Sequence, residues 1–312
     1  MDLSVSIVSW NTRDLLDQCL RSIFETTHGI DFEVIVVDNE SSDGSADMVR
    51  AKYARVLLIE NDENVGFARA NNQAFKVAQG RYFTLLNPDT YIKSGLDEAV
   101  KYMDCNLDVG VLGCKSLNPD GSVQISWNKH YPSLFSEVLY NGIRDRRRIR
   151  DPQIQADKRF PAAWVGGVCM TVRRTAAQQV GLLDEGYFMY SEETDWCRRF
   201  AEAGWRVMHS PCVTIVHFGG QSSKQAPIRA RVELARSKVR FISKFRSRPE
   251  AKAYIAFLSI SGLLKWCFFS VIGVFNQGDS SRVTSPDYWR ALRREYRRLG
   301  TALYCGEQTI ES

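Results

Sequence analysis

Arg81-Tyr-Phe-Thr-Leu-Leu-Asn-Pro-Asp-Thr90 is an aromatic and branched run of the kind that forms a buried strand. Pro88 cannot donate a hydrogen bond to a sheet ladder, so the chain is expected to leave the sheet there. Asp89 follows at once and places a carboxylate at the carboxyl end of the strand. Because open α/β sheets bind their ligands at this edge, the stretch predicts where the chemistry lies.

Three strands precede this one, and a helix follows each of them. The strand-like runs cover residues 3–9, 33–38 and 56–59. Apolar residues at helical spacing follow the first run, turn and cap residues open a helix after the second, and residues 66–79 are helical in pattern after the third. Four strands alternating with helices predict a parallel, doubly wound sheet.

The polar loops after these strands project toward one edge of the predicted sheet. They bring Asn11, Asp38, Asn64 and Asp89 around one crevice. No G-x-G-x-x-G follows the first strand and no G-x-x-x-x-G-K-[S/T] occurs in the chain, which argues against a dinucleotide site or a P-loop. Carboxylates with a divalent cation remain as the means of holding phosphate.

The pattern changes from parallel to antiparallel near residue 110. A strand at residues 109–114 is followed by a hairpin-like turn at residues 118–121 and by a polar loop at residues 144–152, which we expect to be mobile. Residues 164–173 return to strand character, and their paired glycines suggest a close approach to the backbone. A helix begins near Ser191, and two short strands at residues 207–210 and 214–216 lead to His217.

Composition is that of an ordinary globular protein: 312 residues, 44% hydrophobic and 25% charged. The net charge is only +5, but positive charge collects at residues 144–150 and 290–298. This asymmetry points to a phosphate-rich partner or an anionic surface, although a solvated face is the more frequent explanation of a charge run. The eight cysteines show no CxxC pair and are typical of reduced cytosolic core thiols. Residues 1–7 carry no basic leader, so we do not expect a secretory signal.

A long apolar stretch at residues 254–275 stands out in a C-terminal region that is otherwise helical in pattern. It is long enough to span a bilayer, which needs about 20 residues, but Lys265 near its centre costs roughly 2.5–3.5 kcal/mol on insertion. We expect a helix or helical hairpin in the membrane interface, with five arginines reaching anionic head groups: Arg290, Arg293, Arg294, Arg297 and Arg298. A helix packed on the α/β domain or on a second subunit is the alternative.

Each polar residue at the predicted edge also has a plainer use. Asp38 could cap a helix and Asp89 could belong to a turn, while acids in a first helical turn and a partly buried histidine are common. Because all of these residues are expected at one edge of the sheet, a functional site is favoured over several independent structural uses. The residues concerned are Asp38, Asp89, Glu192, Glu193, Asp195 and His217.

Several motifs, in this order along residues 3–223, resemble those of inverting family-2 glycosyltransferases, above all the bacterial rhamnosyltransferase-like branch that builds cell-surface polysaccharides. They are Val8-Ser-Trp-Asn11, Val36-Val-Asp-Asn39 with Ser42-Asp-Gly-Ser45, Asn64-Val-Gly-Phe-Ala-Arg-Ala-Asn-Asn72, Leu86-Asn-Pro-Asp89, Gly166-Gly167, Ser191-Glu-Glu-Thr-Asp195 and His217-Phe-Gly-Gly-Gln-Ser-Ser223. The resemblance implies a GT-A fold, an α/β structure whose Rossmann-like, mostly parallel central sheet is joined by a small antiparallel sheet. It implies a transferase domain at 1–225, with a nucleotide-sugar half at 1–110 and an acceptor half at 111–225, before a helical extension at 226–312.

Roles in donor binding come from the same resemblance. Asp38 would accept the ring N–H of a uracil or thymine base. The loop beside that base consists of Ser9, Trp10 and Asn11. The nucleotide and sugar pocket would be lined by Asn64, Gly66, Arg69, Asn71, Asn87 and Asp89.

The family's DxD motif aligns with Asn87-Pro-Asp89. Asp89 matches its metal-binding aspartate, whereas Asn87 departs from the first aspartate and removes one charge. One carboxylate with diphosphate oxygens is a usual arrangement for magnesium. His217 matches a position that completes the metal shell in some relatives. The resemblance thus implies Mg²⁺ or Mn²⁺ held by Asp89 and His217.

Glu193 falls where such enzymes place their general base, with Glu192 beside it as the second catalytic candidate. The base would take the proton of an acceptor hydroxyl as that oxygen attacks the anomeric carbon from the face opposite the leaving diphosphate. The acceptor site would be formed by Trp164, Gly166, Gly167 and Asp195.

These features predict an inverting, metal-dependent hexosyltransferase that moves a sugar, with rhamnose as a candidate, from a UDP- or dTDP-sugar to a saccharide or polyprenyl-diphosphate-linked saccharide. A sugar-phosphate nucleotidyltransferase and a non-catalytic nucleotide-sugar-binding subunit stay open. The former should show a glycine-rich, basic signature where this chain has Ser9-Trp-Asn-Thr-Arg13, and the latter needs no base. A membrane-surface scaffold would explain only the C-terminal region. We expect a cytoplasmic protein, peripheral on the cytoplasmic face of the cell membrane, with an anionic membrane surface and no nucleic acid as partner; a homodimer is left open.

Overall fold

The computed structural model describes residues 1–139, 155–220, 226–272 and 285–305, which form two compact units. The first unit contains Met1–Tyr131, Ile149–Tyr187 and Glu192–Ser222, and the second contains Pro132–Arg148, Phe188–Ser191 and Ser223–Ser312. Three expected features lie wholly or partly outside the described residues: the whole polar loop at 144–152, residues 221–223 of the last motif, and the end of the apolar stretch at 273–275.

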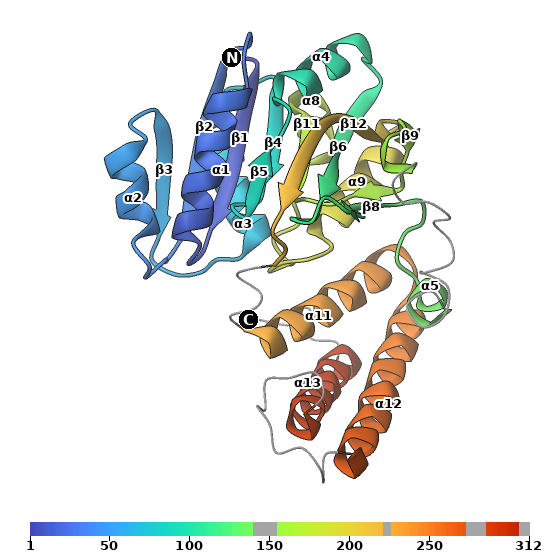
Figure 1. The fold of residues 1–312 in the computed structure, drawn as a ribbon. Coiled ribbons are helices and arrows are strands. Elements are labelled where there is room, and N and C mark those ends of the chain that lie inside the picture. The colour runs from blue at the N-terminus through green and yellow to red at the C-terminus, as the bar shows by residue number, and fades with distance from the viewer. Residues whose placement is uncertain (140–154, 221–225, 273–284, 306–312) are drawn as a thin grey trace. The chain divides into compact units, whose positions relative to one another are not determined.

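The first unit is built on one large sheet, whose first half is parallel as predicted (Figure 1). The strands in order across this half are β3 (Val56–Asn61), β2 (Phe32–Asn39), β1 (Leu3–Ser9) and β4 (Tyr82–Leu86). Ser9 is paired with Asp38, and Ile7 with Leu86. The carboxyl ends of β1, β2 and β4 therefore reach the same edge, because parallel strands in register end together.

The second half of the sheet is mixed and confirms the predicted change of pattern. Beyond β4 come β11 (Cys169–Arg173), β6 (Val109–Leu117), β12 (Arg206–His217) and β5 (Thr90–Ile92). β11 runs antiparallel to both β4 and β6, β12 is parallel to β6, and β5 is antiparallel to β12. Two short strands flank them, β7 (Val123–Gln124) on β6 and β9 (Phe160–Pro161) on β12, and β8 (Trp127–Asn128) pairs with β10 (Trp164–Val165) in a separate small antiparallel sheet. This is the GT-A architecture that was expected, with both halves sharing one sheet.

One strand prediction was wrong in detail. Residues 207–210 and 214–216 were expected to be separate strands, but they belong to the single strand β12, whose register shifts between His209 and Thr214. Pro211 lies within the shift. Since proline removes one ladder hydrogen bond, a bulge accommodates it without ending the strand.

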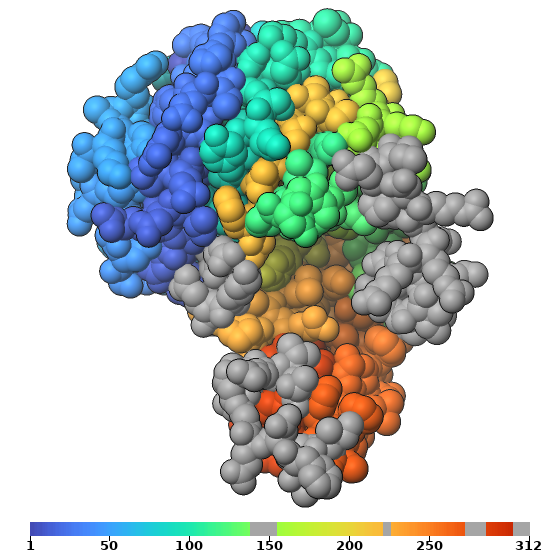
Figure 2. Space-filling view, viewed as in Figure 1, coloured from blue at the N-terminus to red at the C-terminus, as the bar shows by residue number. Residues whose placement is uncertain are grey.

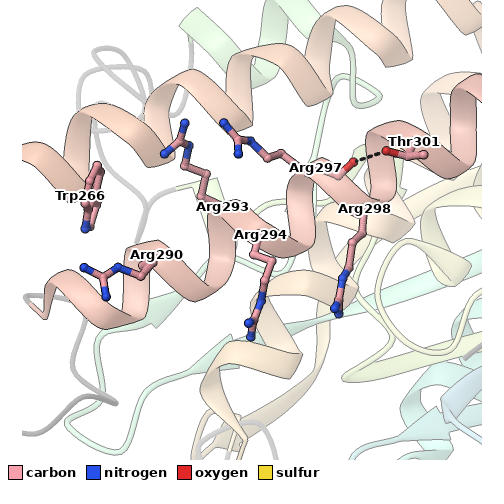
Figure 3. A pocket seen from close by; sticks show the side chains of 7 residues that line it. All are labelled: Trp266, Arg290, Arg293, Arg294, Arg297, Arg298 and Thr301. Carbon is pink, nitrogen blue, oxygen red and sulfur yellow. Dashed lines mark hydrogen bonds between the residues drawn. The ribbon is translucent and has the colours of Figure 1, made fainter.

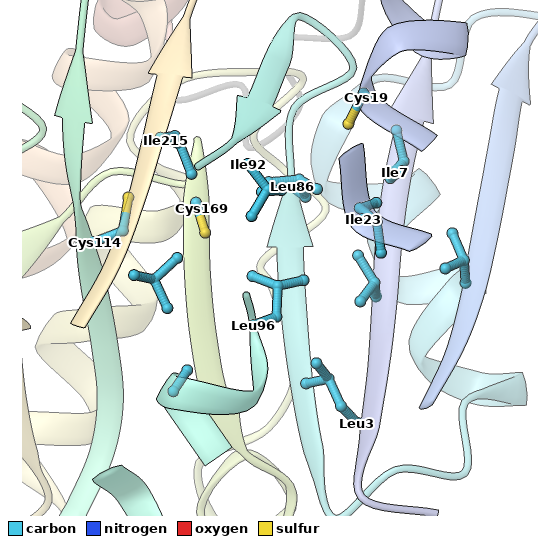
Figure 4. Packing of buried hydrophobic residues seen from close by; sticks show 14 of the residues in the cluster. Leu3, Ile7, Cys19, Ile23, Leu86, Ile92, Leu96, Cys114, Cys169 and Ile215 are labelled. Atoms are coloured by element: carbon cyan, nitrogen blue, oxygen red, sulfur yellow. The ribbon is translucent and has the colours of Figure 1, made fainter. Parts of the chain in front are cut away.

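Helices cover both faces of the sheet, and period-two alternation along the strands decides which side chains meet them. One core packs α1 (Arg13–Thr26), α2 (Ser45–Lys52) and α4 (Asp97–Cys105) on strand residues such as Leu3, Ile7 and Ile215 (Figure 4). The other packs α3 (Phe67–Val77), α8 (Arg174–Val180) and α9 (Glu192–Glu202) on residues such as Ile35 and Leu85. The space-filling view shows the side chains of α1 covering the first strands on one face (Figure 2).

The described cysteines are all free thiols. Cys19, Cys114, Cys169 and Cys197 are buried, as expected for core thiols. Cys105 and Cys267 differ from that expectation because they are exposed.

The second unit is helical and has its own core. Its helices are α5 (Leu134–Leu139), α11 (Pro227–Phe245), α12 (Arg248–Ile272) and α13 (Pro286–Cys305), and buried residues of the last three form one cluster. Among the described residues, the segment Arg248–Val271 is the one helix long and apolar enough to cross a membrane, with mean hydropathy 1.6 and 17% of its most apolar window buried. The Lys265 ammonium lies 4.4 Å from the ring centroid of Trp289, a cation–π contact within the unit.

Candidate active site

The loops that follow β1 and β2 are tied to each other at the carboxyl edge of the sheet. The Asn11 amide N–H donates to Ser41 Oγ at 2.9 Å, and Asn11 Oδ1 accepts the Ser42 N–H at 2.8 Å. Asn11 holds this position in a left-handed conformation, with φ of 52°, which asparagine tolerates better than most residues. Ser9 is fully buried and Trp10 is half-buried in the same loop. Three predicted residues thus lie beside Asp38.

Asp38 has one carboxylate oxygen engaged and one buried without a donor. Its Oδ2 accepts the Ser41 N–H at 2.8 Å. Its Oδ1 is buried and finds no hydrogen-bond partner among the described residues, and the residue as a whole is 4% exposed. A buried acceptor left unpaired is costly and rare in a protein interior. The geometry therefore suits an N–H donor brought by a ligand.

The next predicted group, after β3, divides into loop and helix residues. Asn64 Oδ1 accepts the Gly66 N–H at 3.1 Å, and Gly66 adopts φ of 84°, a left-handed value that glycine allows. Arg69 is exposed and lies 3.4 Å from a carboxylate oxygen of Glu185. Asn71 differs from the expectation that it lines the pocket: it is 1% exposed, accepts from Ser6 Oγ at 2.8 Å and fixes α3 against β1.

The turn after β4 brings Asp89 to His217. Asn87 is half-buried, and its N–H donates to Val168 O at 3.0 Å, while Asp89 is 5% exposed. β5 and β12 pair Thr90 with His217, and His217 Nε2 lies 3.2 Å from Asp89 Oδ1. The two residues proposed as metal ligands, which are far apart in sequence, thus meet at the predicted edge.

Gln124 decides which ring nitrogen of His217 carries the proton. Gln124 Nε2 donates to Asn118 Oδ1 at 3.0 Å, so its Oε1 faces His217 Nδ1, 2.5 Å away, and must accept the Nδ1–H. Nε2 then faces Asp89 Oδ1 and is buried with no hydrogen-bond partner in the described part of the chain. An acceptor nitrogen facing a carboxylate oxygen fits a cation between them, and such outer partners commonly orient metal-binding histidines. The pair therefore fits a divalent ion; no third His, Cys, Asp or Glu completes a cluster among the described residues.

Two glutamates open α9 after a strained segment. Tyr190 and Ser191 have φ of 69° and 65°, left-handed values that are uncommon for side chains of this size. Glu192 is 4% exposed, and its Oε2 is buried without a partner among the described residues, whereas Glu193 is half-buried. Burial raises the pKa of both carboxyls, and for Glu192, where the charge of Glu193 adds to it, the pKa lies well above its ordinary value. Glu193 is the more exposed residue of the pair, and its role as the base stays a prediction.

Gly167 links the glutamates to the turn that carries Asp89. A Cβ placed on Gly167 would lie 3.4 Å from Phe67 Cε1 and 3.7 Å from Glu193 Cβ, so the backbone passes close under both side chains. The next residue, Val168, accepts the Asn87 N–H. Glu193 and the turn that ends at Asp89 are thus neighbours at one edge of the sheet.

Comparison with known proteins agrees with this geometry. The sequence model of the family described as Glycosyl transferase family 2 matches residues 4–181. The chain belongs to glycosyl transferase family 2. It is 28% identical over 250 residues to an N-acetylglucosaminyl-diphospho-decaprenol L-rhamnosyltransferase of Mycobacterium tuberculosis, covering 72% of this chain and 78% of the relative. It is 24% identical to the rhamnosyltransferase WbbL of Escherichia coli K12 over 70% of this chain and 84% of that protein, which places it in the rhamnosyltransferase-like branch.

Solved glycosyltransferases share the fold. A mannosyltransferase from Pyrobaculum calidifontis, solved with GDP-Man and Mn²⁺, superposes with a TM-score of 0.55 at 17% identity over 98% of this chain and 88% of that chain. Residues 1–349 of TarS from S. aureus superpose with a TM-score of 0.51 at 16% identity over 100% of this chain and 93% of that one. At these identities the likeness establishes the fold of the transferase.

The predicted acceptor residues of the glycosyltransferase fall into two groups. Trp164 is half-buried and donates from Nε1 to His130 O at 3.1 Å, and the Gly166 N–H donates to Ser126 O at 2.7 Å, close to the Gly167 turn. Asp195, by contrast, is fully buried, with its Oδ1 2.7 Å from Arg199 Nε and its Oδ2 3.2 Å from the Tyr187 hydroxyl. Its contacts in the structure are structural, and contact with an acceptor stays a prediction.

Sequence reasoning missed two residues that shape this site. Gln124 orients His217, although nothing in the sequence marks it as more than a hairpin residue. Arg199 pairs with Asp195 and donates to the carbonyls of Val180 and Leu182 at 2.8 and 2.7 Å, which ties α9 to the preceding loop. The spacing of Asp195 and Arg199, four residues apart on a helix, was the one available signal.

Proposed function

We propose that this glycosyltransferase acts with inversion, moving a sugar from a UDP- or dTDP-sugar to a saccharide hydroxyl in cell-wall polysaccharide synthesis. The observations that support the proposal are the contact between Asp89 and His217 and the position of Glu193 beside Gly167, close to the turn that ends at Asp89. Rhamnose is the first candidate for the sugar because two relatives are named as rhamnosyltransferases. The name of the mycobacterial relative also supports a polyprenyl-diphosphate-linked saccharide as acceptor.

The donor is held at two points. Asp38 Oδ1, buried and without a partner among the described residues, accepts the ring N–H of uracil or thymine. Asp89 and His217 are the residues that would hold Mg²⁺ or Mn²⁺. A bound cation of this kind stabilises the charge that develops on a leaving diphosphate.

Glu193 acts as the general base on the acceptor. Its carboxylate takes the hydroxyl proton while the acceptor oxygen attacks the anomeric carbon, and the bond from that carbon to the diphosphate oxygen breaks on the opposite face. The configuration at the anomeric carbon therefore inverts. Glu192, whose pKa is raised well above its ordinary value by burial and by the charge of Glu193, is the second candidate for the base.

The second unit brings the enzyme to its lipid-linked acceptor. Its α12 exposes a row of large apolar side chains, and α13 carries five arginines, which together support peripheral binding to an anionic membrane surface at the cytoplasmic face. The row consists of Ile260, Leu264, Phe268 and Val271.

The test of the catalytic assignment is Glu193→Gln. Transfer from the nucleotide-sugar should fall by about 10²–10⁴-fold, the usual contribution of a general base, while calorimetric binding of the donor nucleotide is retained. Glu202→Gln is the matched control because Glu202 is an exposed acid of the same helix, paired with Arg198, and it should leave turnover unchanged. Full turnover by a folded Glu193→Gln protein would exclude Glu193 as the base and direct the test to Glu192.

A further inference from the structure

One side of α13 is lined with arginine. Arg290, Arg293, Arg294, Arg297 and Arg298 recur at helical spacing, while the opposite side buries Trp289, Leu292 and Tyr296. The acids of the helix are Asp287 and Glu295, so five positive charges against two negative ones leave it with a net charge of +3. Like charges on one helical face repel each other, which favours an added anion.

Internal ion pairs relieve only part of this repulsion. Arg298 lies 2.9 Å from Glu295 and Arg290 lies 3.6 Å from Asp287, and both arginines are about 70% exposed. Pairs as exposed as these contribute little. Arg293 and Arg297 pair with no carboxylate in the described chain.

The arginines line an open groove whose remaining wall comes from α12 (Figure 3). Its volume is about 500 Å³, within the usual range of small-molecule sites, and its other lining residues are Trp266 and Thr301. The guanidinium carbons of Arg290 and Arg293 lie 5.7 and 5.9 Å from the ring centroid of Trp266. Trp266 is thus held against two cations.

Trp266 supplies an independent sign that an acceptor is missing. Its indole Nε1 is buried and has no hydrogen-bond partner among the residues that the structure describes. Indole N–H can only donate, and the arginine side chains around it can also only donate. A buried donor surrounded by donors is costly until an anionic oxygen enters the groove.

We propose that the groove is a defined binding site for the phosphate of an anionic phospholipid headgroup. Trp266 Nε1–H and the guanidiniums of Arg290 and Arg293 donate to its oxygens, and the other arginines of the groove attract neighbouring headgroups. This inference rests on the proposed membrane association and deepens it, because it assigns a hydrogen-bonded site where a diffuse basic surface would otherwise suffice.

A lipid is favoured over a free anion because the unit also suits the bilayer boundary. The same helix α12 exposes Ile260, Leu264, Phe268 and Val271 by 59, 64, 58 and 74%. A row of this kind, four large apolar side chains spaced by three or four residues, usually marks an interaction surface. Tryptophan and arginine in helices that also expose large apolar side chains are typical of the membrane interface.

The experiment is cosedimentation of the full chain with phosphatidylcholine vesicles that contain increasing phosphatidylglycerol. Arg293→Gln/Arg297→Gln should weaken binding to anionic vesicles by about 30-fold, from about 1 kcal/mol for each arginine near the surface. Arg55→Gln/Lys76→Gln removes the same charge from exposed positions of the first unit and should have little effect. Trp266→Phe keeps charge and ring but removes the donor, and should weaken binding about tenfold.

Trp266→Phe distinguishes a defined, hydrogen-bonded phosphate site from a diffuse basic surface. If Trp266→Phe binds anionic vesicles as tightly as the wild type while the double arginine variant binds them less tightly, the proposal is overturned in favour of a diffuse basic surface. If Trp266→Phe does not fold, Arg293→Lys gives the same test, since it keeps the charge and loses the guanidinium fork.

Two further binding measurements identify the molecule that supplies the phosphate. Competition by millimolar inorganic phosphate together with no binding to anionic vesicles would assign the groove to a soluble anion. Preference for a prenyl diphosphate over phosphatidylglycerol at equal vesicle charge would assign it to the acceptor. Either result would overturn the headgroup assignment. Because thermal shift with UDP- and dTDP-sugars is measured on the same proteins without vesicles, failure of the proposed donor binding is seen separately from failure of this site.

Discussion

Glu192→Gln should stabilise the protein, and the gain should grow with pH. Glu192 is 4% exposed, one of its oxygens has no partner among the described residues, and the Glu193 carboxyl is beside it. Burial, followed by repulsion from Glu193, raises the Glu192 pKa well above the ordinary value of 4.5. Glutamine has the same shape and never ionises, so the substitution removes the penalty of charging this site.

The magnitude follows from linkage between proton binding and folding. Below pH 4.5 Glu192 is protonated in both the native and the unfolded chain, so the site adds no penalty. Above that pH the unfolded chain releases the proton first, and wild-type stability falls by about 1.4 kcal/mol per pH unit until Glu192 ionises in the native state. For a unit of about 200 residues this corresponds to roughly 4 °C in Tm per pH unit.

The assay is thermal unfolding of wild type and Glu192→Gln in matched buffers from pH 4 to pH 8. The Tm difference should widen from pH 4.5 upward and then level off where Glu192 titrates. The exposed Glu202→Gln variant should show no such slope. A Tm difference that is constant with pH, or that shrinks as pH rises, would refute the claim that the native state holds Glu192 protonated.

Three other perturbations follow from the site. Asp38→Asn should weaken calorimetric binding of uridine or thymidine nucleotides about tenfold, because an amide loses a charge-assisted hydrogen bond; unchanged affinity would remove Asp38 from the base site. Gln124→Ala should lower the Mn²⁺ affinity, read as the metal-dependent thermal shift with donor, by 10–100-fold through the freed His217 ring, and a shift equal to wild type would argue against the cation site. Arg199→Met should lower the free energy of unfolding in urea by about 3–5 kcal/mol, because it removes the ion-pair partner of the buried Asp195. Adding Asp195→Asn should restore part of that loss, and strictly additive losses would contradict the pairing.

The sequence alone was sufficient for most of the fold. Apolar alternation and helical spacing predicted β1 to β4 and their helices, and Asn87-Pro-Asp89 placed a carboxylate at the end of β4, where the structure has it. Such features are local: a proline removes one ladder donor wherever it stands, and a buried strand needs branched or aromatic residues in any context. The continuous strand β12 was missed because a bulge absorbs Pro211, and only the paired strands show that.

The functional residues likewise divide into those that the sequence identifies and those whose contacts only the structure shows. Sequence by itself determined which acids and which histidine belong to the family motifs, because those are chemical identities at fixed positions. Only the tertiary structure decided that Gln124, 93 residues from His217, contacts that ring, that Asn71 and Asp195 are buried in structural contacts, and that burial raises the pKa of both Glu192 and Glu193. Hydrogen-bond partners and burial depend on strand register and packing between distant segments, and no local pattern of residues carries that information.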